Sequence, residues 1–78
     1  MDEQQSREIG AYIRARREDA SLSTRELASR VGVDMAQIVR LEQGKVASPR
    51  ADLLGRIADE LKIPASDLMT MAGYPTSR

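Results

Sequence analysis

Six side chains near the middle of the sequence could recognise a partner through hydrogen bonds and methyl contacts. At 100° per residue, Ile38 and Leu41 define the buried side of a helix. The residues opposite that side are Met35, Ala36, Val39, Arg40 and Gln43, with Gln37 at the margin. The guanidinium of Arg40 and the amide of Gln37 can each make a bidentate contact, while the apolar members offer methyl groups. This surface therefore predicts that the helix recognises a partner through these contacts.

Catalysis has little support in this sequence. The chain has no histidine and no cysteine, so the usual acid-base residue and the thiolate metal ligands are both missing. No nucleophile elbow, glycine-rich phosphate loop or metal-spaced cluster occurs. Asp59 and Glu60 are adjacent on an expected helix and point in different directions, which indicates solvated charges. We therefore expect no enzyme, no cofactor and no metal site.

Length and composition favour a small binding module. With 78 residues the chain predicts one domain over 1–78, too small for a deep enzyme cleft. No apolar run approaches the roughly 18 residues of a membrane helix, and the N-terminus lacks the pattern of a signal peptide. We expect a cytoplasmic protein without a membrane partner. Twelve basic residues balance twelve acidic ones, but residues 7–50 carry nine bases against six acids, a mild polarity that suits contact with phosphate.

Apolar residues recur at helical spacing along most of the chain, and no segment shows sustained two-residue alternation. The pattern predicts an all-α domain of compact form. Its helices are expected at about 6–19, 24–32, 35–43, 49–61 and 64–73, followed by a frayed tail at about 74–78. The fourth helix is expected to start at Ser48-Pro49, a capping residue followed by proline at the first helical position.

Two capped helices meet at a glycine in the centre of the chain. Ser23 and Glu26 have the spacing of a capping box, Gly32 can end the helix in a left-handed conformation, and Asp34 can cap the next helix. The pair, over about 24–43, has the layout of a helix-turn-helix, which presents its second helix to the major groove of duplex DNA. By spacing alone, any three-helix core could also contain such a pair.

The residues add a resemblance to this layout. The stretch LSTRELASRVGVDMAQIVRLEQGKVASPR closely resembles the helix-turn-helix of the Cro and phage-repressor family, also called the XRE family. The family pattern is met at Leu22-Ser23, Glu26-Leu27-Ala28, Gly32-Val33, Ile38, Leu41-Glu42, Gly44, Pro49, Leu54, Ile57-Ala58, Leu61 and Ile63. The resemblance implies a five-helix lambda-repressor-like domain of bacterial or phage origin that binds operator DNA as a two-fold dimer and regulates transcription.

The resemblance also implies contacts to the DNA backbone. In this family an arginine at the position of Arg17 pairs with the glutamate after the recognition helix, here Glu42, and the residue matching Thr24 contacts phosphate. The residues expected to bind phosphate are Arg17, Ser23, Thr24, Gln43, Lys45 and Arg50. A solvated surface charge is the alternative for Arg17, Lys45 and Arg50.

The candidate base readers depart from familiar members of the family. The expected readers are Met35, Ala36, Gln37, Val39 and Arg40. Arg40 suits guanine and Gln37 suits adenine, while the apolar residues can pack on thymine methyl groups. Many relatives carry glutamine or serine at the positions of Met35 and Ala36, and glutamine at that of Thr24. An exposed apolar strip is also typical of a protein-docking face, so an antitoxin-like or scaffold module is the alternative.

The expected function is that of a sequence-specific regulator, a repressor, that binds a pseudo-palindromic operator in double-stranded DNA as a homodimer, with half-sites about 10 bp apart. A regulatory protein partner is compatible with this reading. Apolar residues without an evident place in the core are the dimer candidates. They are Leu53, Met69, Met71 and Tyr74.

Overall fold

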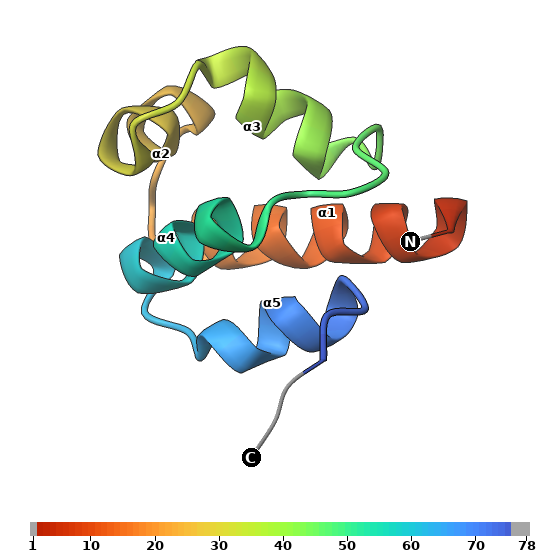
Figure 1. Cartoon of the computed structure of the whole chain (residues 1–78). Helices are drawn as coiled ribbons and strands as arrows, with labels where there is room; N and C mark the ends of the chain where they lie inside the picture. Colours follow the sequence, from red (N-terminus) through yellow and green to blue (C-terminus); the bar gives the residue numbers. More distant parts are fainter. Residues whose placement is uncertain (1, 76–78) are drawn as a thin grey trace.

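The computed structural model describes residues 2–75 as five helices joined by short loops (Figure 1). The helices are α1 (Glu3–Asp19), α2 (Thr24–Val31), α3 (Met35–Glu42), α4 (Ala51–Leu61) and α5 (Ala65–Met71). No strand occurs within residues 2–75, which confirms the predicted all-α class. None of the helices in this range combines the length and the apolar character needed to cross a bilayer.

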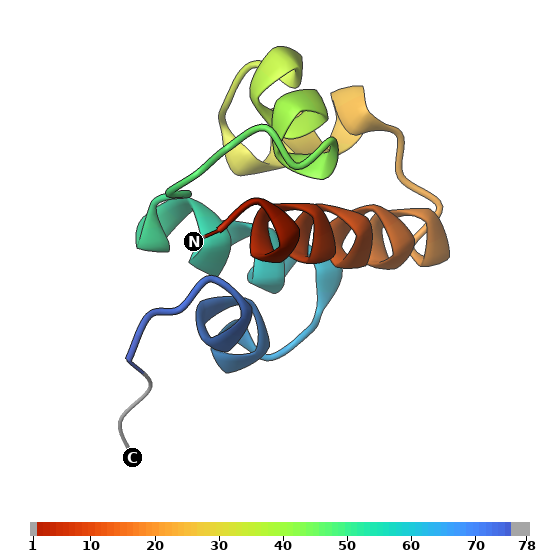
Figure 2. The same cartoon turned by 90° about the vertical axis from the view of Figure 1, so that its right-hand side faces the viewer.

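The helices form layers around one apolar core. In both views α3 lies at one end of the molecule and α5 at the other, with α1 and α4 between them (Figures 1 and 2). α3 packs on α1 and α2, whereas α5 packs on α4 and α1. The buried core residues are Ile9, Ile13, Leu27, Ala28, Val31, Ile38, Leu41, Leu54, Ile57, Ala58, Leu61, Leu68 and Ala72. α3 and α5 therefore lie on opposite faces of the molecule.

Two helix starts differ from the sequence prediction. α1 begins at Glu3 rather than near Ser6, because Asp2 caps it: the Gln5 N–H donates to Asp2 Oδ1 (2.7 Å) and the Asp2 N–H donates to Gln5 Oε1 (2.9 Å). α4 begins at Ala51, not at Ser48-Pro49. Arg50 is still extended, with ψ near 143°, and Pro49 is buried outside the helix.

The segment after α5 is held against the fold at Tyr74. Its N–H donates to the Met69 carbonyl (2.9 Å), and its hydroxyl donates to the Pro49 carbonyl (2.7 Å). Tyr74 is thus bonded to the fold, while the expectation that the tail frays at about 74–78 stays a prediction. The remainder of that prediction, residues 76–78, lies outside the described part of the chain.

The four dimer candidates have a place in the packing after all. Leu53, Met69, Met71 and Tyr74 are each partly buried against the core. The expectation that they have no place in the core is therefore wrong. Their role in a dimer stays a prediction.

Candidate DNA-binding surface

α2 and α3 form the helix-turn-helix, over residues 24–42. The Glu26 N–H donates to Ser23 Oγ (3.0 Å) and the Ser23 N–H donates to Glu26 Oε1 (2.8 Å), so the expected capping box starts α2. These bonds with Ser23 lower the pKa of Glu26. Gly32 ends α2 in the left-handed conformation (φ 86°), which only glycine adopts at little cost. The turn then leads directly into α3.

The outward face of α3 carries the expected readers. Met35 (41% exposed), Ala36, Gln37 and Arg40 are exposed, whereas Val39 is half-buried. Val39 lies in a groove of about 240 Å³ between α3 and the α1–α2 side of the fold. The structure thus brings the readers together on one helix, with Val39 at the edge of the set.

The amide of Gln37 is partly committed to its own helix. The Asp34 N–H donates to Gln37 Oε1 (3.2 Å), which fixes the side chain at the start of α3. This oxygen keeps one lone pair, and Nε2 has no acceptor within residues 2–75. A bidentate contact from Gln37 therefore has to coexist with the cap or break it, whereas Arg40 carries no such commitment.

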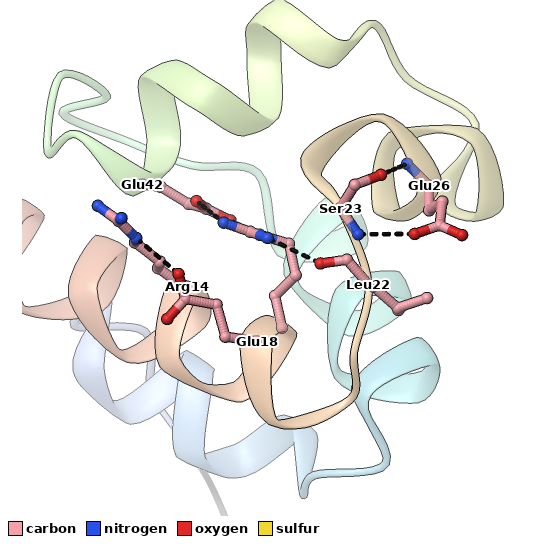
Figure 3. Close-up of polar contacts among 7 residues, drawn as sticks. Arg14, Glu18, Leu22, Ser23, Glu26 and Glu42 are labelled. Carbon is pink, nitrogen blue, oxygen red and sulfur yellow. Dashed lines mark hydrogen bonds and ion pairs between the residues drawn. The ribbon is translucent and has the colours of Figure 1, made fainter.

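A buried ion pair locks α3 to α1. Arg17 donates from Nε to Glu42 Oε2 (2.6 Å) and from Nη2 to Glu42 Oε1 (2.9 Å), and a third bond runs from Nη1 to the Leu22 carbonyl (2.7 Å). The two accepting residues, Glu42 and Leu22, are labelled in Figure 3. The side chains are only 10% and 6% exposed. The hydrogen bond to Glu42 is the main cause that raises the pKa of Arg17. Since each of the three guanidinium nitrogens donates one of these bonds, the pair fixes the angle of α3.

Two glycines allow α3 to approach α1 closely. A Cβ at Gly10 would lie 2.4 Å from the Leu41 carbonyl oxygen and 2.6 Å from that of Glu42. A Cβ at Gly44 would lie 2.9 Å from the Arg7 Cα. The sequence prediction missed the role of Gly10, for which the signal is a glycine in the middle of an otherwise regular helix.

The phosphate candidates at the start of α2 differ in which hydrogen-bond donors they can still offer. The Ser23 N–H donates to Glu26, and the Ser23 hydroxyl oxygen accepts the Glu26 N–H, so the hydroxyl hydrogen is the donor that Ser23 can still offer to a phosphate. The backbone N–H groups of Thr24 and Arg25 donate no hydrogen bond within residues 2–75. They mark the positive end of α2, where an anion is stabilised.

On the other side of α3, the start of α4 presents a cluster of three charged side chains. Arg50 donates from Nε to Asp52 Oδ1 (3.1 Å), and Arg56 donates from Nη2 to Asp52 Oδ2 (3.2 Å). Arg56 also donates from Nη1 to the Val31 carbonyl (3.1 Å) at the end of α2. These three residues and Gln37 line one shallow groove beside α3.

Most cations of the fold are paired with carboxylates. Among residues 2–75, the cationic side chains without an ion pair are Arg25, Arg40, Lys45 and Lys62. The first three belong to α2, α3 and the loop that follows α3. Free positive charge therefore gathers around the helix-turn-helix although the net charge is zero. The sequence prediction included Arg40 and Lys45 but missed Arg25, which stands beside the free N–H groups of α2.

Comparison with known proteins supports this arrangement. A family model described as a helix-turn-helix domain matches residues 8–69. The HTH-type transcriptional repressor RghR of Bacillus subtilis is 42% identical over 66 residues, which are 85% of this chain and 49% of RghR. An uncharacterised HTH-type transcriptional regulator of Mycobacterium tuberculosis is 41% identical over 64 residues, covering 82% of this chain and 45% of that protein. The chain thus spans about half the length of these relatives.

A solved structure has the same fold. The clp gene regulator ClgR from Corynebacterium glutamicum superposes with a TM-score of 0.77 at 26% identity, covering 88% of this chain and 72% of ClgR. The family match extends from α1 into α5 and so includes the helix-turn-helix and the helices that support it. The chain belongs to the helix-turn-helix domain family, of the XRE type.

Proposed function

We propose that this chain is the DNA-binding part of a transcriptional regulator, a repressor, that reads duplex DNA with α3. The observation that carries the proposal is Arg40: it is exposed on the outward face of α3 and pairs with no carboxylate among residues 2–75. A free guanidinium on a helix that enters the major groove suits the N7 and O6 acceptors of guanine. The relative RghR is itself named a transcriptional repressor.

Backbone contacts on both sides of α3 would set its register on the duplex. On one side are the free N–H groups of Thr24 and Arg25 with the Arg25 side chain, and on the other is Lys45. Such contacts orient a protein on DNA but carry little sequence information. Arg17, which the sequence suggested for phosphate, has its donors directed to Glu42 and Leu22, so we assign it to positioning α3.

Operator binding as a homodimer is part of the proposal. Met69 and Met71 on α5 lie at the end of the molecule opposite α3, where a second copy would not obstruct DNA (Figure 1). Leu53 instead lines grooves beside α3, together with Gln37. We therefore favour α5 over Leu53 for the contact between copies, with two half-sites about 10 bp apart.

A protein-docking module is the second candidate, and one observation favours it. Among residues 2–75, Met35 is the one large hydrophobic residue that is exposed, and it lies on α3 beside Ala36. Methionine packs adaptably against varied partners. The strip is short, since Val39 is half-buried.

Selection from random duplex DNA tests the proposal. The purified chain is incubated with a random library at two salt concentrations, and the bound pools are sequenced. We expect enrichment of a two-fold motif that persists at the higher salt, because base contacts add to backbone attraction. Retention without any motif, lost at the higher salt, would contradict sequence reading and direct attention to Met35 as a docking residue.

A further inference from the structure

The cluster of Arg50, Asp52 and Arg56 at the start of α4 includes a negative charge, whereas positive charge alone would favour binding to the DNA backbone. Arg50 lies at the N-cap position of α4 and Asp52 in its first turn. Neither is buried: their side chains are 82% and 54% exposed. The groove that they line also contains Gln37 of α3, so the cluster borders the surface proposed to read DNA.

The two arginines of the cluster are held differently. Arg56 reaches across to α2, where the Val31 carbonyl accepts its Nη1–H (3.1 Å), and it bonds to Asp52 from the same helix (3.2 Å). Within residues 2–75, the Arg50 guanidinium has only the bond to Asp52 (3.1 Å). Removing the Asp52 charge would therefore leave Arg56 tied to Val31 but would release Arg50.

We propose that Asp52 is a positioning residue that holds Arg50 away from the DNA backbone and so weakens binding to every duplex. This inference rests on the proposed DNA-binding function. Binding to phosphate depends on cations that replace the counterions of DNA, and a carboxylate that pairs with a cation competes with phosphate for it. Asp52 also supplies negative charge at the start of α4, where a phosphate would otherwise be favoured.

The mechanism predicts a change in strength without a change in preference. Asp52 does not belong to the outward face of α3, so its charge alters contacts to phosphate and leaves contacts to base edges as they are. A regulator whose attraction to the DNA phosphates is weakened in this way would spend less time bound to unrelated sequences at a given concentration, because non-specific binding is almost entirely electrostatic.

The test compares Asp52→Asn with Asp59→Asn in duplex binding measured across a range of salt concentrations. Both variants remove one carboxylate charge from α4, but Asp59 forms no ion pair within residues 2–75. We expect Asp52→Asn to bind operator and unrelated duplexes roughly two- to fivefold more tightly at low salt. The slope of log affinity against log salt should steepen by about 0.9, the value of one added phosphate contact. Asp59→Asn should show a clearly smaller gain.

A double-mutant cycle identifies the residue through which Asp52 acts. Arg50→Ala should have a small effect in the wild-type chain and should abolish the gain in the Asp52→Asn chain. A gain equal to that of Asp59→Asn, or one that survives Arg50→Ala, would overturn the role of Asp52 while DNA binding by the wild type still stood. Absence of duplex binding by wild type and Asp52→Asn alike would overturn both this inference and the proposed function.

Discussion

The two sides of α3 use arginine–carboxylate pairs in opposite ways. Toward α1, the pair of Arg17 and Glu42 is bidentate, nearly buried and completed by the Leu22 carbonyl. Toward α4, the pair of Arg50 and Asp52 is single and exposed. A buried pair holds a geometry because breaking it strands a charge, whereas an exposed pair contributes little to stability.

The two sides of α3 are expected to have different roles: one side positions the helix, and the other affects the charge beside it. The α1 side determines where α3 stands, through the ion pair and through the close approach at Gly10. On the α4 side, Asp52 pairs with Arg50 and Arg56, and we propose that this pairing limits the positive charge offered next to α3. Stability should therefore respond to changes on the α1 side, and the salt dependence of DNA binding should respond to changes on the α4 side and in the loop before it.

The largest effect on stability is expected from Glu42→Ala. The change leaves the Arg17 guanidinium buried without its carboxylate, and we expect a loss of about 3 to 5 kcal/mol in the free energy of unfolding. Urea denaturation measures it. Glu18→Ala is the matched control, because Glu18 pairs with Arg14 at the exposed surface (3.2 Å) and should cost less than about 1 kcal/mol. Equal losses in the two variants would remove the distinction between the buried and the exposed pair.

Gly10→Ala should have the next largest effect. The added methyl group meets backbone oxygens of α3, which cannot rotate away, so α1 and α3 must separate. We expect a loss of about 1 to 3 kcal/mol, the usual cost of overpacking, although alanine is the better helix former. Thermal unfolding measures it, with Gly55→Ala as the control because, among residues 2–75, a Cβ at that position meets no atom within 4 Å beyond its own stretch of helix. A Gly10→Ala chain as stable as Gly55→Ala would show that the close approach is unimportant.

Lys45→Ala should leave stability nearly unchanged and alter only DNA binding. Lys45 is exposed and forms no ion pair within residues 2–75, so its charge is available to phosphate. The salt slope should fall by about 0.9, with similar weakening for all sequences. Lys62→Ala, which removes an equally unpaired charge between α4 and α5, is the control. If both variants lose the same slope, the effect is one of net charge and not of a contact beside α3.

Local chemistry explains which features could be predicted from the sequence. The capping box of Ser23 and Glu26 and the glycine stop at Gly32 depend on neighbours within a few residues, and the structure contains both. The start of α1 depends on an equally local pair, Asp2 with Gln5, but it precedes the first apolar residue of the helix pattern and was missed. For α4, the serine-proline pair predicted a helix start two residues too early, because the backbone is still extended at Arg50 and the helix begins at Ala51.

Features that join distant segments were harder to predict. The close approach at Gly10 depends on where α3 crosses α1, which no spacing in the sequence reveals. The same holds for the bond from Tyr74 to Pro49 and for that from Arg56 to Val31. The ion pair of Arg17 and Glu42 also joins distant segments, and it was expected only because the sequence resembles a family in which these positions pair.

The central claim is that α3 reads bases through Arg40 while its surroundings position it. The most direct measurement repeats the selection from random duplexes with Arg40→Ala beside Lys45→Ala. We expect Arg40→Ala to lose preference at one base pair of each half-site, at a cost of about 1 to 3 kcal/mol on the preferred sequence, and Lys45→Ala to keep the motif. A motif that is unchanged in Arg40→Ala would contradict the assignment of Arg40 as the reader.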